Sequence, residues 1–140
     1  MKPFYLLDTC IVSEAVKPEP SPLVLEKLKK YEGLTAISAV VWHELLFGVN
    51  RLPGGRRKSR LEVFLRELVA PHIPVIPYDD HAAWFHASLR AQLEKEGRSL
   101  SFADGQIAST ALANNMILVT RNKSDFVGIQ HLYIENWFLV

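Results

Sequence analysis

The chain has 140 residues, of which 49% are hydrophobic and 22% are charged, and its formal net charge is +1 at pH 7. These values exclude a disordered tail, a collagen-like fibre and a disulfide-built mini-protein, and they fit one domain over residues 1–140. No apolar run approaches the ~20 residues that a membrane span needs. The single cysteine, Cys10, has no partner for an internal disulfide, so we expect a reduced, cytoplasmic protein.

Short β-type runs alternate with longer helical patterns along the whole chain. In chain order, the first half predicts a strand over residues 4–7, a short helix through Ile11, Val12 and Ala15, a helix beginning at Ser21-Pro22, a strand over 34–37 and a helix over 39–50. The second half predicts a helix over 57–69, a strand over 73–76, helices over 80–95 and 102–113, and strands over 117–119 and 132–134.

Two details refine this pattern. Leu61, Phe64, Leu65 and Leu68 share one face of the helix expected over 57–69. Pro74 and Pro77 cannot donate hydrogen bonds to a neighbouring strand, so the third strand should lie at an edge of the sheet. The alternation as a whole predicts an α/β fold with a mainly parallel sheet and helices on both faces.

Acidic residues occur at the ends of the predicted strands. Asp8 ends the first strand, Asp104 opens the helix that leads into the fourth, and Asn122 and Asp125 follow the fourth strand directly. In open parallel sheets, ligands bind in the crevice beyond the carboxyl ends of the strands. These side chains therefore converge if strands one and four are neighbours. Glu44, in a strongly apolar helix, reaches the same crevice if that helix packs beside strand one.

Each of these positions also has a purely structural interpretation. Asp8 suits a helix cap, Asp104 fits a capping box with Ser101, and Asn122 and Asp125 suit a turn. Because all of them are predicted at the same edge of the sheet, we favour a functional site instead. Carboxylates held within ~4–6 Å raise each other's pKa, a divalent cation relieves that repulsion, and all-oxygen ligands favour Mg²⁺ or Mn²⁺.

Four segments carry a family resemblance. They are YLLDT at residues 5–9, WHELLFG at 42–48, FADGQIA at 102–108 and LVTRNKSDF at 118–126. In this order they resemble the PIN-domain family, and within it the VapC-type toxins of toxin–antitoxin pairs. The resemblance covers nearly the whole chain. It implies a PIN-like three-layer sandwich whose five-stranded sheet has the order 3-2-1-4-5.

The resemblance also implies an activity, a Mg²⁺- or Mn²⁺-dependent endoribonuclease. By position, Asp8, Glu44 and Asp104 match the three acids of the family's metal site. The fourth position holds neutral Asn122, with Asp125 three residues later, and either one can complete the site.

Further roles and partners follow from the same resemblance. Thr9 matches a hydroxyl beside the first acid, and Ser13 has a lesser polar role. The family further implies an RNA substrate, a homodimer, and a cognate antitoxin whose chain lies across the toxin and blocks the site.

A basic run surrounds two glycines in the middle of the chain. Arg51, Arg56, Arg57, Lys58 and Arg60 fall within ten residues that contain no acid. Gly54-Gly55 predicts a mobile loop there. The run is interpreted either as a solvated surface or as a contact for the RNA phosphate backbone through Arg56 and Arg57. Arg121, near the expected site, is a further candidate for phosphate contact.

Other functions stay open beside the toxin nuclease. One is a metal-free PIN-like module that binds RNA or protein, and another is a housekeeping RNA-processing nuclease. An aspartyl-nucleophile phosphotransferase fits poorly, because its usual second aspartate would stand at Cys10.

Overall fold

The computed structural model describes residues 3–140. At its centre is an all-parallel, five-stranded sheet with the order β3-β2-β1-β4-β5. The strands are β1 (Tyr5–Leu7), β2 (Thr35–Ser38), β3 (Val75–Ile76), β4 (Ile117–Val119) and β5 (Ile134–Glu135). This confirms the predicted fold class and strand order.

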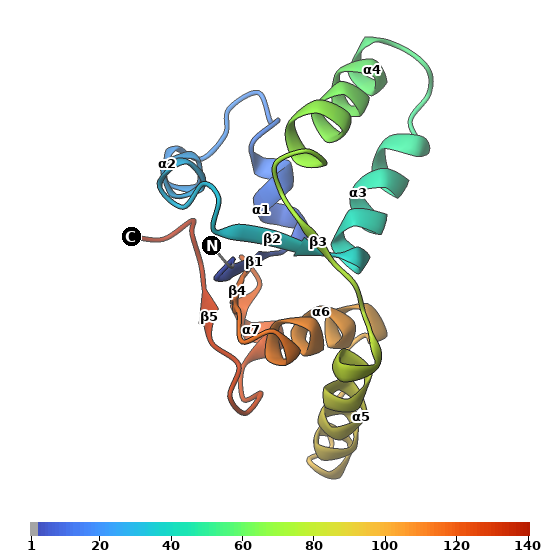
Figure 1. Cartoon of the computed structure of the whole chain (residues 1–140), viewed down its shortest axis with the longest axis vertical. Coiled ribbons are helices and arrows are strands. Elements are labelled where there is room, and N and C mark those ends of the chain that lie inside the picture. Colours follow the sequence, from blue (N-terminus) through green and yellow to red (C-terminus); the bar gives the residue numbers. More distant parts are fainter. Residues whose placement is uncertain (1–2) are drawn as a thin grey trace.

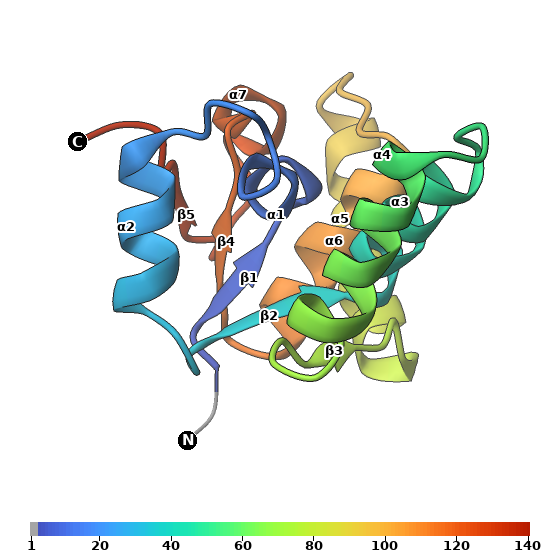
Figure 2. The ribbon, with the colours of Figure 1, turned by 90° about the horizontal axis from the view of Figure 1, so that it is seen from above.

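Helices cover both faces of this sheet. They are α1 (Thr9–Glu14), α2 (Pro22–Lys30), α3 (Ala39–Asn50), α4 (Arg56–Val63), the π-helical η1 (Phe64–Val69), α5 (Asp80–Lys95), α6 (Phe102–Ala113) and α7 (Lys123–Phe126). Helices α1 to α4 lie on one side and α5 to α7 on the other (Figures 1 and 2). From β1 to β3 each new strand is added toward one edge of the sheet, and after β3 the chain crosses back to add β4 and β5 toward the other edge. Because the crossovers are right-handed, this reversal places the later helices on the opposite face. Within residues 3–140, no helix has the length and apolar character to cross a bilayer.

Three helices begin at serine caps that the sequence indicates. The hydroxyl oxygens of Ser21, Ser38 and Ser101 accept hydrogen bonds from the third backbone N–H that follows, at 3.4, 3.1 and 3.1 Å. Each cap satisfies a donor that the first helical turn leaves without an internal partner. The starts of α2, α3 and α6 are therefore local properties of the sequence.

The third strand lies at the sheet edge, as its prolines predict. Pro74 contributes only its carbonyl, which accepts a hydrogen bond from the Ile37 N–H at 3.0 Å. Pairing extends over Val75 and Ile76 alone. Pro74 and Pro77 bracket this strand, so it is shorter than the predicted residues 73–76.

The helix expected over residues 57–69 changes its winding partway. After α4 the chain continues as η1, whose wider turns bury Leu65 and Val69. Leu68 consequently turns away from the core and is 59% exposed. Its predicted place on the buried face is wrong, because the 3.6-residue period does not hold through a π-helical segment.

The last strand is displaced from its predicted position at residues 132–134. His131 has a positive φ of 68°, and the Leu132 N–H bonds back to the Ile129 carbonyl, so the chain is still turning there. Pairing with β4 begins only at Ile134. Beyond it, the buried Trp137 packs against Tyr5 and Tyr31, with ring centroids 5.3 and 5.6 Å away.

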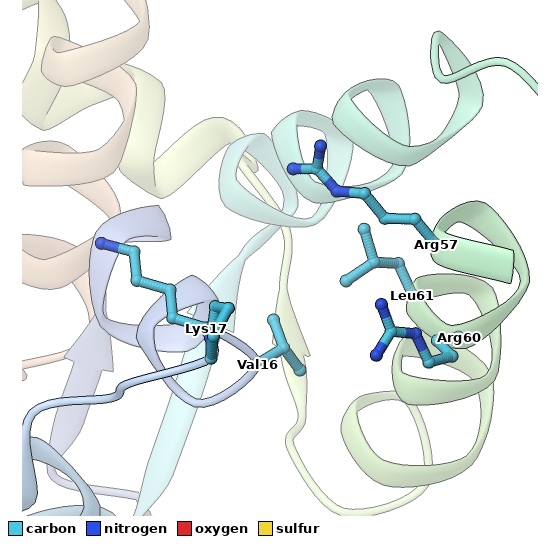
Figure 3. A pocket seen from close by; sticks show the side chains of 6 residues that line it. Val16, Lys17, Arg57, Arg60 and Leu61 are labelled. Carbon is cyan, nitrogen blue, oxygen red and sulfur yellow. The ribbon is translucent and has the colours of Figure 1, made fainter.

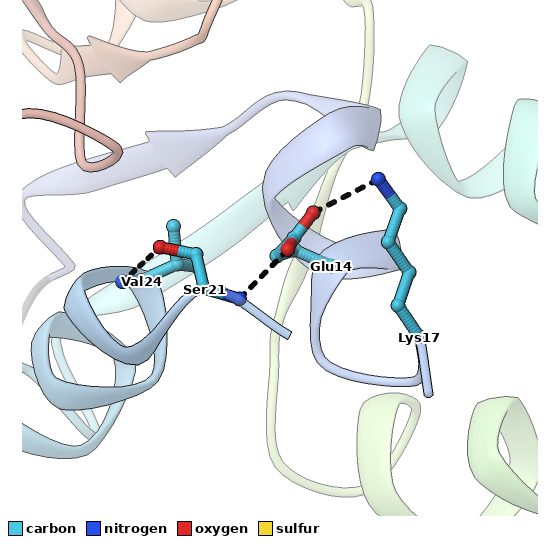
Figure 4. A network of polar contacts seen from close by, with 4 residues as sticks. All are labelled: Glu14, Lys17, Ser21 and Val24. Atoms are coloured by element: carbon cyan, nitrogen blue, oxygen red, sulfur yellow. Dashed lines mark hydrogen bonds and ion pairs between the residues drawn. The ribbon is translucent and has the colours of Figure 1, made fainter. Parts of the chain in front are cut away.

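A buried carboxylate joins the end of α1 to the start of α2. Glu14 Oε2 accepts a hydrogen bond from the Ser21 N–H at 2.8 Å, and Oε1 lies 3.0 Å from Lys17 Nζ (Figure 4). Hydrogen bonding with Lys17, and then with the Ser21 backbone, lowers the pKa of Glu14. The Arg121 charge lowers it further.

This network predicts a pH dependence of stability. Because the folded-state pKa of Glu14 is below its unfolded value, the ionised carboxylate stabilises the fold above that unfolded value. The contribution is lost as pH falls through the folded pKa. We expect Glu14→Gln to be less stable than the parent chain near neutral pH, and the difference to shrink on acidification. Urea unfolding at a series of pH values measures it; a constant difference across the acidic range would contradict the assignment.

Candidate active site

Three of the predicted acids, Asp8, Glu44 and Asp104, lie on elements that pack together at the carboxyl edge of the sheet. Asp8 directly follows β1, and its N–H donates to the Val119 carbonyl of β4 at 2.9 Å. Helix α6 leads into β4 and so runs against the strand direction, which brings its first turn, with Asp104, to the same edge. Helix α3, with Glu44, packs against both α1 and α6.

The Asp8 carboxylate is held at both oxygens. Oδ1 accepts from the Thr9 N–H at 2.8 Å, which makes Asp8 the N-cap of α1. Oδ2 accepts from the Thr120 hydroxyl at 2.7 Å. Asp8 is only 9% exposed, so these bonds fix the orientation of a nearly buried charge. The capping role and the site role of Asp8 are thus compatible.

A second threonine positions the glutamate. The Thr9 hydroxyl donates to Glu44 Oε2 at 2.7 Å, across 35 residues of sequence. Thr9 therefore ties α1 to α3 and aims the Glu44 carboxylate at the carboxyl edge. Ser13 lies one turn beyond Thr9 on the same face of α1.

Asp104 reports the convergence of the acids. Burial raises its pKa above the ordinary carboxyl value, while hydrogen bonding to the Ser101 side chain lowers it. The negative charges of Asp8, Asp125 and Glu44 raise the pKa further. The charges of acids from three other segments therefore act on the Asp104 carboxylate.

The two candidates for the fourth position differ in what they contact. Asn122 is exposed and precedes α7, and its N–H donates to the Thr120 hydroxyl at 3.1 Å. Asp125 lies in the first turn of α7, and its charge acts on Asp104. The expected turn after β4 is therefore a short helix, and the charge of Asp125 in it acts on Asp104.

A small residue is required directly behind Asp104. Gly105 is buried, and a Cβ at this position would overlap the His86 imidazole. The His86 ring is held in turn by a 2.8 Å hydrogen bond between its Nδ1 and the Tyr78 hydroxyl. Burial, and then the Arg90 charge, lower the pKa of His86. This packing of α5 on α6 sets the position of the α6 first turn.

The arginines that are candidates for phosphate contact lie in two separate places. Arg121 directly follows Thr120, and its guanidinium lies 4.3 Å from the centre of the Phe138 ring. Arg56 and Arg57 are in the first turn of α4, so the loop expected at Gly54-Gly55 is confined to residues 51–55 and the rest of the basic run is helical. None of the acids lines the cavity formed by Arg57.

The donor chemistry at the edge fits a hard divalent cation, although the side chains are not arranged as a ready ligand set. Among residues 3–140, no group of three or more His, Cys, Asp or Glu side chains is arranged to hold a metal ion. The carboxylates of Asp8 and Glu44 each keep lone pairs beyond those used for the threonines. Asp104 and Asp125, like Asp8 and Glu44, offer only oxygen donors. Cys10 is not suited to the role of nucleophile, because burial raises the pKa of its thiol.

Sequence reasoning assigned no role to Thr120. It is fully buried at the end of β4, where its hydroxyl donates to Asp8 and accepts from the Asn122 N–H. The available signal is a hydroxyl residue directly after a buried apolar strand. Its function appears only when β1 and β4 are neighbours.

We expect Thr120→Val to destabilise the chain by about 1–3 kcal/mol, because it leaves the Asp8 carboxylate and the Asn122 N–H without their shared partner. Thr120→Ser keeps the hydroxyl and is the matched control. The free energy of unfolding in urea measures both variants. Equal stability of the valine and serine variants would show that the hydroxyl does not anchor Asp8.

The chain is similar in sequence to known proteins over nearly its whole length. The PIN domain family model matches residues 5–130. The chain is 36% identical over 135 residues to VapC ribonuclease Y4jK of Sinorhizobium fredii, covering 94% of this chain and 96% of the relative. It is 35% identical over 136 residues to Ribonuclease VapC2 of Rickettsia felis, covering 95% and 97%.

Solved structures agree in the backbone. FitAcB from Neisseria gonorrhoeae superposes with a TM-score of 0.91 at 28% identity, over 98% of this chain and 100% of that one. VapBC2 from Rickettsia felis, bound to a promoter DNA fragment, gives 0.80 at 31% identity, over 98% and 99%. The chain therefore belongs to the PIN-domain family, in its VapC-type group.

Proposed function

We propose that this chain is the endoribonuclease toxin of a toxin–antitoxin pair, and that Asp8, Glu44, Asp104 and Asp125 form its catalytic site. The observation that carries the proposal is the geometry at the carboxyl edge of the sheet, where Thr9 binds both Asp8 and Glu44 by hydrogen bonds and α6 begins with Asp104 in its first turn. The two relatives named above are ribonucleases by name. Asp125 supplies the fourth charge, and neutral Asn122 is at most a neutral oxygen ligand.

The proposed cofactor is Mg²⁺ or Mn²⁺, held by the four acids. Bound there, such an ion supplies an activated water and positive charge at the scissile phosphate. All four proposed ligands are oxygen donors, whereas structural zinc sites prefer sulfur and nitrogen ligands. The donor set therefore favours Mg²⁺ or Mn²⁺ over zinc.

The chain's own residues orient the site. Thr120 fixes Asp8, and Thr9 fixes Glu44, so these two carboxylates are aligned before the substrate arrives. Arg121, stacked on Phe138 and exposed, is placed to contact a phosphate of the bound RNA.

The central test replaces one acid at a time. Asp8→Asn or Asp104→Asn should reduce Mg²⁺-dependent RNA cleavage by about 100-fold or more, because each loses a charged ligand of the cation. Sequencing the ends of RNA cleaved by the purified variants measures this.

The matched control for these variants is Asp80→Asn, which removes an exposed acid from the first turn of α5. Full activity of Asp8→Asn would refute the assignment. Titration with Mn²⁺ by calorimetry separates the nuclease from a metal-free binding module, which would give no binding heat.

The antitoxin surface that we propose is an apolar groove between α2 and η1. It has a volume of about 430 Å³, and its lining includes Val12, Ala15, Leu25, Leu28 and Leu68. Leu25 and Leu68 are 39% and 59% exposed, so an apolar partner face would cover them. FitAcB and VapBC2 are complexes by name, which supports an antitoxin as the occupant. Helix α1, which forms one wall, begins at Asp8, and this geometry suits a partner that also blocks the site.

Leu68→Asp should weaken binding of the co-expressed antitoxin by about tenfold or more, since it puts a charge into an apolar contact. Leu139→Asp, at an exposed leucine outside the groove, is the control. Calorimetric titration of each toxin variant with antitoxin measures the change. Equal affinities for the two variants would place the antitoxin elsewhere.

The remaining parts of the proposal concern assembly and location. The chain forms a homodimer, a state that would cover the exposed aromatic rings of Phe47 on α3 and Trp84 on α5. It acts in the cytoplasm, where the free Cys10 stays reduced.

A further inference from the structure

A second charged feature lies apart from the acids, between the end of α1 and helix α4. It is a cavity of about 540 Å³ lined by Val16, Lys17, Pro18, Arg57, Arg60 and Leu61. The side chains of Arg57 and Arg60 extend from α4 toward Val16 and Lys17, and Leu61 faces Val16 between them (Figure 3). Arg57 and Arg60 therefore border a small apolar floor, and the Lys17 stem completes the lining while its ammonium points away from α4 and pairs with Glu14 (Figure 3).

An adjoining hollow continues this feature along α4. It has a volume of about 780 Å³ and is lined by Gly55, Arg56, Ser59 and Arg60. Arg60 is shared by both hollows. The two hollows together form an elongated surface with four positive side chains. We call it the α4 basic surface, and its members are Lys17, Arg57, Arg60 and Arg56.

These cations are poorly balanced within the chain. Among residues 3–140, the ion pairs are Lys17–Glu14, Arg66–Glu67 and Arg98–Glu96, so the three arginines of the α4 basic surface have no carboxylate at pairing distance. The first turn of α4 also holds no acid. Like charges around one cavity repel each other, and a bound anion offsets that repulsion.

The arrangement favours an anion with repeating charge. A single carboxylate side chain would engage one hollow, whereas a phosphodiester backbone presents a charge at every step and can occupy both. Arginine guanidinium groups match phosphate oxygens in two-point hydrogen bonds.

We propose that the α4 basic surface is a backbone subsite that holds the RNA strand beyond the cleavage position. This inference rests on the proposed nuclease function, because that function makes RNA the relevant polyanion. The subsite acts through charge and shape, so it contributes affinity without reading the base sequence.

The test measures RNA affinity separately from cleavage. Labelled single-stranded RNA is bound to the full chain in EDTA, which prevents metal-dependent cutting, over a series of KCl concentrations. Arg57→Gln/Arg60→Gln should weaken binding roughly tenfold or more at low salt and reduce the slope of log affinity against log salt by about 1 to 1.5, as expected for two lost single-strand phosphate contacts.

Two further variants serve as controls. Arg66→Gln/Lys95→Gln removes the same charge from exposed positions that line neither hollow, and it should leave the slope close to the parent value. Arg57→Lys/Arg60→Lys should restore most of the slope, because the slope depends on charge. Thermal unfolding checks that every variant is folded.

The outcomes separate the hypotheses. An unchanged slope in Arg57→Gln/Arg60→Gln, or a loss no larger than in the control, overturns the subsite. Normal RNA binding combined with weakened antitoxin binding also overturns it and assigns the surface to the partner. Cleavage retained by Asp8→Asn would refute the proposed nuclease site instead, and would leave the salt slope to be judged independently.

Discussion

The arrangement of acids at the carboxyl edge of the sheet depends on two threonine hydroxyls that hold carboxylates from other segments. Thr120 donates to Asp8 across 112 residues, and Thr9 donates to Glu44 across 35. Both bonds are 2.7 Å long, the short distance expected for a hydroxyl bound to a charged acceptor. They connect β4 to β1 and α1 to α3, so the geometry of the acids follows from the packing of the sheet and its first helices.

Gathering negative charge in this way is unfavourable, and the fold offsets part of that cost. Asp8 caps α1, and Asp104 lies in the first turn of α6, so both carboxylates stand at helix N-termini, where the helix dipole favours negative charge. Burial, and then the charges of Asp8, Asp125 and Glu44, nevertheless raise the pKa of Asp104. The same arrangement therefore places these acids at helix N-termini and brings them to one edge of the sheet.

The near-neutral net charge conceals a separation of charge over the surface. Acids concentrate at the carboxyl edge, while the α4 basic surface lies between α1 and α4. A polyanionic substrate is repelled by the first region and attracted by the second. In the function that we propose, the basic surface gives such a substrate affinity, and a divalent cation among the acids would make its approach to them favourable.

The local pattern of the sequence determined most of the fold. Serine caps, apolar periods and the prolines around β3 act over a few residues, and they predict the helix starts, the edge strand and the position of each acid relative to a strand end. Tertiary structure alone decided the rest. Leu68 is exposed because η1 winds more widely than an α-helix, and Thr120 gains its role only beside Asp8. Such contacts join residues far apart in the chain, and no local period records them. The effect of the Asp125 charge on Asp104 likewise depends on where α7 places Asp125 in space, which the spacing along the chain does not contain.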